Sequence, residues 1–325
     1  MSIRATALAL LFLLLPAAGS AAEHELSLLA GTMQDTDTGK PSYTWQLEFR
    51  NWVNEHFGVS VSYLNEGHVP NHHRDGGAVQ VWTSASVIDP RLHLSGGIGP
   101  YYYFDSTQPI PGSDYTNEHG WGGIGSVALS WQGRSRLIYQ LRANVVETGS
   151  LDSQALLFGV GYQWDSRPQA SGPANAAVHD AGKKNELSLL AGRTIVNSFD
   201  SEHALALGVE YRRRLGRLFE GTIGVLDEGE TGTIDRAGLE AQLWLARDFL
   251  DDRISLGVGS GGYYAGDRDH RQDQGERDFF LSGITSITAG FRFAADWKIR
   301  TTWSRVRSHY DRDTDVVMIG LGYLF

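Results

Sequence analysis

Apolar and polar residues alternate along most of this chain with a period of two. The segment YTWQLEFR at 43–50 places four apolar side chains on one face and Thr, Gln, Glu and Arg on the other. The segments FGVSVSY at 57–63 and LALGVEYR at 205–212 follow the same scheme. Successive side chains of a β-strand point to opposite faces, so this period predicts strands rather than helices.

Eight such segments are expected in the first half of the chain, and their counterparts follow in the second half. The connections after the second, fourth and sixth strands are short, whereas the others are generally longer and the largest spans 105–120. This alternation is typical of an antiparallel barrel that spans a membrane. Hydrocarbon offers no partner to a backbone amide, so a spanning sheet must close on itself. The expected strands lie at about 25–34, 43–54, 56–66, 76–88, 91–104, 120–132, 135–147 and 153–164.

One unit has been duplicated within the chain. ELSLLAG at 25–31 returns at 186–192, and FGVGYQW at 158–164 corresponds to IGLGYLF at 319–325. The segment between the copies is rich in Ala, Pro, Gly and Ser and is typical of a linker. We therefore expect a signal peptide at 1–22, a first eight-stranded unit at 23–164, a linker at 165–184 and a second eight-stranded unit at 185–325.

Composition restricts the location and the partners of these units. Residues 1–22 have one Arg, an apolar run and small residues before a cleavage site after Ala22, which is typical of a secretory signal. The chain has no cysteine, so disulfides and thiolate metal sites are excluded. A net charge of −10 argues against binding to nucleic acid. A soluble alternative remains open at this point, namely lipocalin-like barrels or sandwiches with apolar interiors.

The last ten residues, VVMIGLGYLF, place apolar side chains on one face and end in Phe325. This segment resembles the C-terminal signal of Gram-negative outer-membrane β-barrel proteins. The resemblance implies an outer-membrane location, recognition by the barrel assembly machinery, and outer-membrane lipid and lipopolysaccharide as partners. A surface glycan or a small solute is a further expected ligand.

Each unit is also similar in size and strand count to the lipid A deacylases of the outer membrane. That family carries a His-x-Ser motif on its next-to-last strand, and neither LRANVVETGS at 141–150 nor TTWSRVRSHYD at 301–311 contains it. Ser304, Ser308 and His309 lie nearby, but without the motif they do not imply deacylase activity. An enzyme is thus left uncertain and not favoured, and no cofactor is expected.

The number of barrels decides between two functions. The end of the first unit already looks like a closing strand and the linker is far longer than a turn, which favours two tandem eight-stranded transmembrane barrels. Eight strands enclose a space that side chains fill, whereas sixteen leave an aqueous lumen. Two barrels indicate a non-enzymatic protein that presents surface loops for an envelope or ligand-binding role. One sixteen-stranded barrel would indicate a porin or export channel, and a lipid hydrolase is a third alternative.

Two groups of polar residues are expected to serve the architecture of the barrels. Glu66, Arg74, Glu228 and Arg236 occupy equivalent positions in the two copies, so a Glu–Arg pair is expected to brace the base of one loop in each unit. Other polar residues are expected to line the interiors as structural ion pairs and hydrogen-bonding groups. These interior candidates are Glu48, Arg50, Gln80, Glu210, Arg212 and Gln242.

The stretch from Glu66 to Asp75 is expected to form a surface loop that holds His68, His72 and His73. Imidazoles and a carboxylate are ligands for zinc or copper, so these three histidines and Asp75 are metal candidates. Their spacing matches no standard motif. The alternative is a solvated loop whose charge depends on pH.

Overall fold

The computed structural model is built of sixteen β-strands. It describes residues 23–108, 114–133, 136–165, 183–216, 218–249, 252–268 and 278–325. The predicted signal peptide and residues 166–182 of the predicted linker lie outside the described residues. Within the described ranges, no helix has the length and apolar character needed to cross a membrane.

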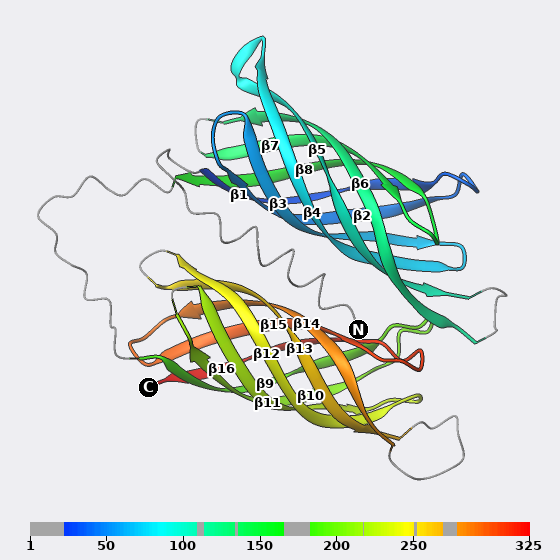
Figure 1. The fold of residues 1–325 in the computed structure, drawn as a ribbon, viewed down its shortest axis with the longest axis vertical. Coiled ribbons are helices and arrows are strands. Elements are labelled where there is room, and N and C mark those ends of the chain that lie inside the picture. Colours follow the sequence, from blue (N-terminus) through cyan, green and yellow to red (C-terminus); the bar gives the residue numbers. More distant parts are fainter. Residues whose placement is uncertain are drawn as a thin grey trace, which may run out of the picture. The chain divides into compact units, whose positions relative to one another are not determined.

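The first eight strands form one closed antiparallel barrel, barrel 1 (Figure 1). Each strand pairs with the next, and β1 closes the ring by pairing with β8 from Glu23↔Asp165 to Asp35↔Ser153. The strands are β1 (Glu23–Asp35), β2 (Pro41–Trp52), β3 (Phe57–Val69), β4 (His72–Val87), β5 (Asp89–Thr107), β6 (Thr116–Gln132), β7 (Leu137–Glu147) and β8 (Ser153–Asp165).

The other eight strands form a second closed barrel, barrel 2, in which β16 pairs with β9. The alternative of a single sixteen-stranded barrel is therefore wrong, because both edges of each eight-stranded sheet are already used within that sheet. The strands are β9 (Asn185–Val196), β10 (His203–Arg214), β11 (Phe219–Glu230), β12 (Asp235–Phe249), β13 (Ile254–Asp267), β14 (Asp278–Arg292), β15 (Trp297–Arg307) and β16 (Thr314–Leu324).

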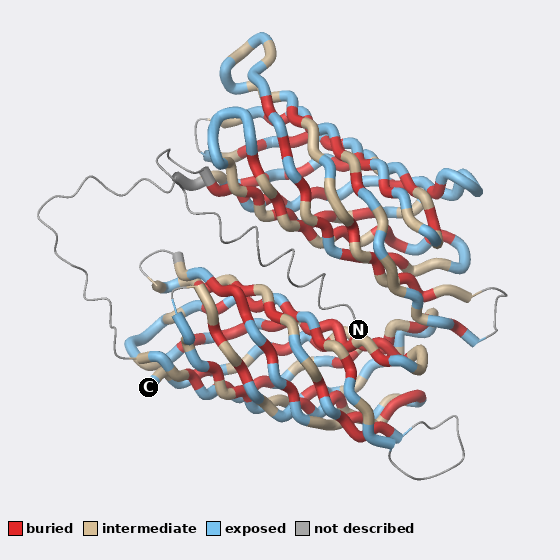
Figure 2. The backbone as a smooth tube through the Cα atoms, in the orientation of Figure 1, coloured by how far each residue is buried: buried red, intermediate tan, exposed pale blue. Residues whose placement is uncertain are grey.

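The outward face of each barrel is mainly apolar, and the interior holds the buried charged residues together with a smaller apolar cluster. Burial alternates along the strands (Figure 2), and on β7 the side chain of Leu141 is 47% exposed while its neighbour Arg142 is 0% exposed. This distribution is the reverse of a water-soluble barrel. Both barrels are transmembrane β-barrels, since hydrocarbon around them would cover the exposed apolar wall and the ladders satisfy the backbone. Each strand has at least 11 residues, enough for a tilted crossing.

Several strands are longer than the sequence predicts. β3 continues to Val69 and β4 already begins at His72. Most of the expected Glu66–Asp75 loop is therefore strand. The ladder shifts register between Asn65 and His68, where Gly67 has a φ of 69°. This bulge lets the hairpin continue beyond the apolar wall, where no alternating pattern marks it.

A tryptophan fills the interior of each barrel at the same level. The indole of Trp82 lies over Gly97 and that of Trp244 lies over Gly259, where an added Cβ would meet ring atoms at 2.6 Å and 2.4 Å. Each indole N–H donates to a hydroxyl, of Ser60 at 2.8 Å in barrel 1 and of the equivalent Thr222 at 2.9 Å in barrel 2. The glycines make room for the rings.

Candidate functional site

Ion pairs connect polar side chains inside barrel 1 near its terminal end, which is the end at which β1 begins and β8 finishes. Glu48 accepts hydrogen bonds from Arg50 at 2.6 Å and from Arg142 at 2.5 and 2.9 Å. The guanidinium of Arg50 lies 3.9 Å from the ring centroid of Trp82. All four side chains are at most 1% exposed. They fill the interior at this level, as expected for eight strands.

Barrel 2 has a related cluster at its own terminal end. Arg212 pairs with Glu210 and Glu220, both at 3.0 Å, and its guanidinium lies 4.2 Å from the ring of Trp244. A second arginine, Arg300, donates to Glu186 at 2.6 and 2.8 Å. The interior at this end thus contains two arginine–carboxylate groups.

The six predicted interior residues all lie inside the barrels. Glu48, Arg50, Glu210 and Arg212 belong to the clusters above. Gln80 donates to Ser126 at 2.9 Å, and Gln242 donates to Glu240 at 3.1 Å. Every one of these interactions is with another interior side chain.

The opposite end of barrel 1, its loop end, is crossed by one arginine. Arg74 donates to Glu66 at 2.6 and 2.7 Å and to the hydroxyl of Thr148 at 2.9 Å. It also donates to the carbonyl of Leu151, and Ser153 donates to Glu66. This confirms the Glu66–Arg74 pair expected from the repeat and shows that it ties β3 and β4 to the β7–β8 connection. We call this arrangement the loop-end clamp.

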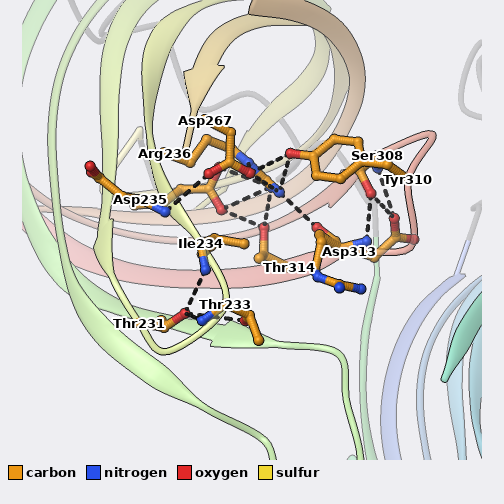
Figure 3. Close-up of polar contacts among 12 residues, drawn as sticks. Thr231, Thr233, Ile234, Asp235, Arg236, Asp267, Ser308, Tyr310, Asp313 and Thr314 are labelled. Carbon is orange, nitrogen blue, oxygen red and sulfur yellow. Dashed lines mark hydrogen bonds and ion pairs between the residues drawn. The ribbon is translucent and has the colours of Figure 1, made fainter. Parts of the chain in front are cut away.

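Barrel 2 has the same clamp with an added carboxylate. Asp267, Tyr310 and Thr314 surround the guanidinium of Arg236 (Figure 3). Arg236 lies 3.4 Å from Glu228 and 3.2 Å from Asp267, and it donates to the Tyr310 hydroxyl at 2.7 Å. The tyrosine in turn donates to Asp267 at 2.5 Å. One guanidinium therefore neutralises part of the charge of two buried carboxylates.

The four metal candidates do not converge. Outside the undescribed stretches, no group of three or more His, Cys, Asp or Glu is arranged to hold a metal ion. The rings of His68 and His73, which face each other across β3 and β4, stack with centroids 3.7 Å apart. His72 points the other way and pairs with Asp105 at 2.8 Å. Asp75 lies on the outward face of β4, opposite Asn65.

Different surroundings shift the pKa values of these histidines in opposite directions. The hydrogen bond to Asp105 raises the pKa of His72 above 6.5. Burial and the neighbouring imidazole of His68 lower the pKa of His73 to about 4. His72 is thus the histidine of this hairpin whose surroundings favour the protonated form.

The hydrolase candidates on β15 and its connection to β16 have other contacts. The Ser308 hydroxyl donates to Asp313 at 3.2 Å and accepts from the Arg312 amide at 2.8 Å. His309 packs edge-on against Phe280. The proton of the serine hydroxyl is directed to a carboxylate rather than to an imidazole, so these residues do not form a nucleophile–base pair.

Several interior residues could not be found from the repeat. Arg142 aligns with Thr302, and Arg300 aligns with Gln140, so neither arginine has a copy to draw attention to it. Each reaches its partner carboxylate across more than 90 residues of chain. Tyr310 follows a strand end in a polar segment, which carries no periodic signal.

Comparisons with known proteins show only weak likenesses. The sequence matches no family model and no curated protein. Among solved structures, the N-terminal β-barrel domain of OprF from Pseudomonas aeruginosa aligns over 44% of this chain and 97% of its own, with 8% identity and a TM-score of 0.35. Ail of Yersinia pestis aligns over 45% and 100%, with 12% identity and a TM-score of 0.35. Neisserial surface protein A aligns over 45% and 99%, with 10% identity and a TM-score of 0.35.

Proposed function

We propose that this chain is a non-enzymatic outer-membrane protein of a Gram-negative bacterium that uses two filled barrels to anchor surface loops. The observation that carries the proposal is the occupied interior. Arg50, Arg74 and Arg142 in barrel 1, and Arg236 and Arg300 in barrel 2, are fully buried and paired with interior carboxylates. Buried ion pairs of this kind occupy space that an aqueous channel would need.

Rigid interiors favour a scaffold over a channel. Breaking a buried ion pair leaves an uncompensated charge and costs about 3–5 kcal/mol, so the clusters resist opening. The loop-end clamps connect the β7–β8 and β15–β16 connections to the opposite wall, which holds the bases of those connections in place. A protein that presents surface loops needs the bases of those loops to be fixed, whereas a channel for solutes does not.

The exposed apolar walls support a membrane location, and the predicted signal peptide directs export of the chain. Outer-membrane lipid and lipopolysaccharide are then the surrounding partners, and insertion depends on the barrel assembly machinery. A surface glycan or a small solute remains a proposed ligand of the loops.

Fractionation and electrical recording test this proposal together. The full chain, produced in a Gram-negative host, should be found in the outer-membrane fraction and should migrate differently on gels before and after boiling. In planar lipid bilayers the purified protein should give no steady conductance above background. A stable conductance of porin size would contradict the proposal, as would recovery of folded protein from the soluble periplasmic fraction.

A further inference from the structure

A cavity opens at the terminal end of barrel 2. Residues from both ends of the second unit line it, namely Lys183 and Lys184 before β9 and Leu324 at the end of β16. Arg212 lines it from deeper in the barrel. The cavity has a volume of about 60 Å³, which gives room for about four water molecules. It can therefore hold a small polar group and no large ligand.

Barrel 1 has apolar side chains at the equivalent level. The ring of Trp52 covers Gly58, where an added Cβ would meet it at 2.7 Å. Ile138 is buried with 2% exposure. The repeat places Arg214 at the position of Trp52 and Lys298 at that of Ile138, and both line the cavity of barrel 2. The charges at these positions are therefore specific to barrel 2 and no requirement of the duplicated fold.

Three carboxylates of the cavity are already bound by arginines. Glu186 accepts hydrogen bonds at 2.6 and 2.8 Å from the second interior arginine of this end, on β15. Glu220 pairs with Arg212 at 3.0 Å, and Asp248 accepts from Arg214. These pairs reduce the repulsion that an incoming anion would meet. The lining also includes one more residue of each sign, Asp252 and Arg292.

The ammonium group of Lys298 has fewer partners. The residue is 6% exposed. Its Nζ donates to the Ser255 hydroxyl at 3.2 Å and lies 3.7 Å from Glu186, beyond hydrogen-bond length. An ammonium group has three N–H donors, and a buried donor without an acceptor is costly. In the part of the chain that the structure describes no other group accepts from it, so the remaining donors are available to the cavity that Lys298 lines.

Lys184 adds a second ammonium group at the mouth of the cavity. Its side chain is exposed, and none of the residues described forms an ion pair with it. Its backbone carbonyl accepts from the Arg214 amide at 2.8 Å, which holds the main chain at this point. Lys183 differs, because it pairs with Asp296. The cavity thus presents ammonium donors both at its mouth and on its inner wall.

We propose that this cavity binds a small oxyanion, with Lys298 and Lys184 donating to its oxygens. Ammonium groups form charge-assisted hydrogen bonds with carboxylate and phosphate groups. Such an anion supplies the acceptors that Lys298 lacks, and its size matches the volume of the cavity. In the orientation of the proposed function this end lies opposite the surface loops and faces the periplasm, so the anion belongs to a periplasmic solute.

Calorimetric titration of the full chain in detergent tests this inference. The probes are sodium phosphate and sodium acetate in a buffer that contains neither anion, with sodium chloride at equal ionic strength as the reference. Wild-type protein should bind at least one probe saturably at one site per chain, and the stronger probe tells a phosphate group from a carboxylate group. A hydrogen bond to a charged group contributes about tenfold or more to binding, so K298M should weaken the affinity at least about tenfold. K184Q should cause a smaller loss, because Lys184 is exposed.

One control variant and one test of folding accompany these measurements. Lys40 is an exposed lysine of barrel 1, so K40Q should bind the probes as the wild type does. Methionine is similar in length to lysine, and K298M leaves Glu186 with its arginine, so the barrel should still form. Heat-dependent migration on gels verifies that each variant is folded.

Three results would overturn the inference. They are the absence of saturable binding above the chloride reference, unchanged binding in K298M or K184Q, and a loss in K40Q equal to that in K298M. Failure of the proposed function is seen separately, as folded protein outside the membrane fraction, because anion binding is measured on the solubilised chain.

Discussion

The two barrels place the same arginine at the loop end and surround it with different partners. In barrel 1, Arg74 serves one carboxylate, Glu66, while His72 takes Asp105. In barrel 2, Ile234 stands at the position of His72, and Arg236 serves both Glu228 and Asp267. The replacement of His72 by Ile234 thus accompanies a change in the partner of the equivalent buried aspartate, from the histidine to the clamp arginine.

The difference shows which part of a duplicated barrel is constrained. Both copies keep the ladder, the tryptophan over its glycine and the clamp arginine. The positions of the interior charged residues differ between the two copies, on the condition that each buried carboxylate retains a hydrogen-bond donor. Substitutions in matched pairs measure how far this equivalence extends.

Loss of the clamp arginine should have the largest effect, and a larger one in barrel 2. R236L leaves two buried carboxylates without their cation and should lower the free energy of unfolding by about 3–5 kcal/mol, whereas R74L leaves one and should lower it less. Urea titration in lipid bilayers measures both. The exposed R268L variant is the control and should change stability by less than about 0.5 kcal/mol. A larger loss in R74L than in R236L would contradict the comparison.

The tryptophan–glycine contacts should respond alike in the two barrels. In G97A and G259A the new methyl group meets an indole ring, and overpacking of this kind costs about 1–3 kcal/mol. G125A is the matched control, because an added Cβ there meets nothing within 4 Å. Unfolding free energies from the same titration give the three values. If G125A proved as harmful as G97A, the loss would come from the backbone and not from the indole.

The smallest expected effect is a pH dependence of stability that distinguishes barrel 1 from barrel 2. The pKa of His72 is raised above 6.5 in the folded state, so its ion pair contributes fully below pH 6.5, and the contribution is lost as pH rises through the folded pKa. For this partly exposed pair we expect about 1 kcal/mol or less. Unfolding midpoints measured on both sides of this pH range should shift in the wild type. H72Q should flatten the profile, and a profile unchanged by H72Q would assign the titration to another group.

Much of the architecture could be predicted from residues alone. The period of two identified the strands, and the spacing of the repeat identified the Glu66–Arg74 and Glu228–Arg236 pairs. Both depend on local order or on comparison of the two copies. The partnership of Arg142 with Glu48 depends instead on closure and stagger of the barrel, which join residues 94 positions apart.

The histidine stretch shows the opposite case. Its polar composition is typical of a loop, yet the hairpin continues as strand through a bulge at Gly67. In a strand, neighbours point to opposite faces, so His72 and His73 diverge. The metal hypothesis counted residue types without this alternation.

Closure of each barrel on itself is the central claim, and the chain is suited to a direct test because it has no native cysteine. Leu28 on β1 is opposite Val160 on β8, and opposite positions in a ladder are close enough for a disulfide. Under oxidation in membranes, L28C/V160C should crosslink within the chain, while L28C/L321C, which would join β1 to β16, should remain reduced. A disulfide between positions 28 and 321, with none between 28 and 160, would show a single sixteen-stranded barrel and contradict the account.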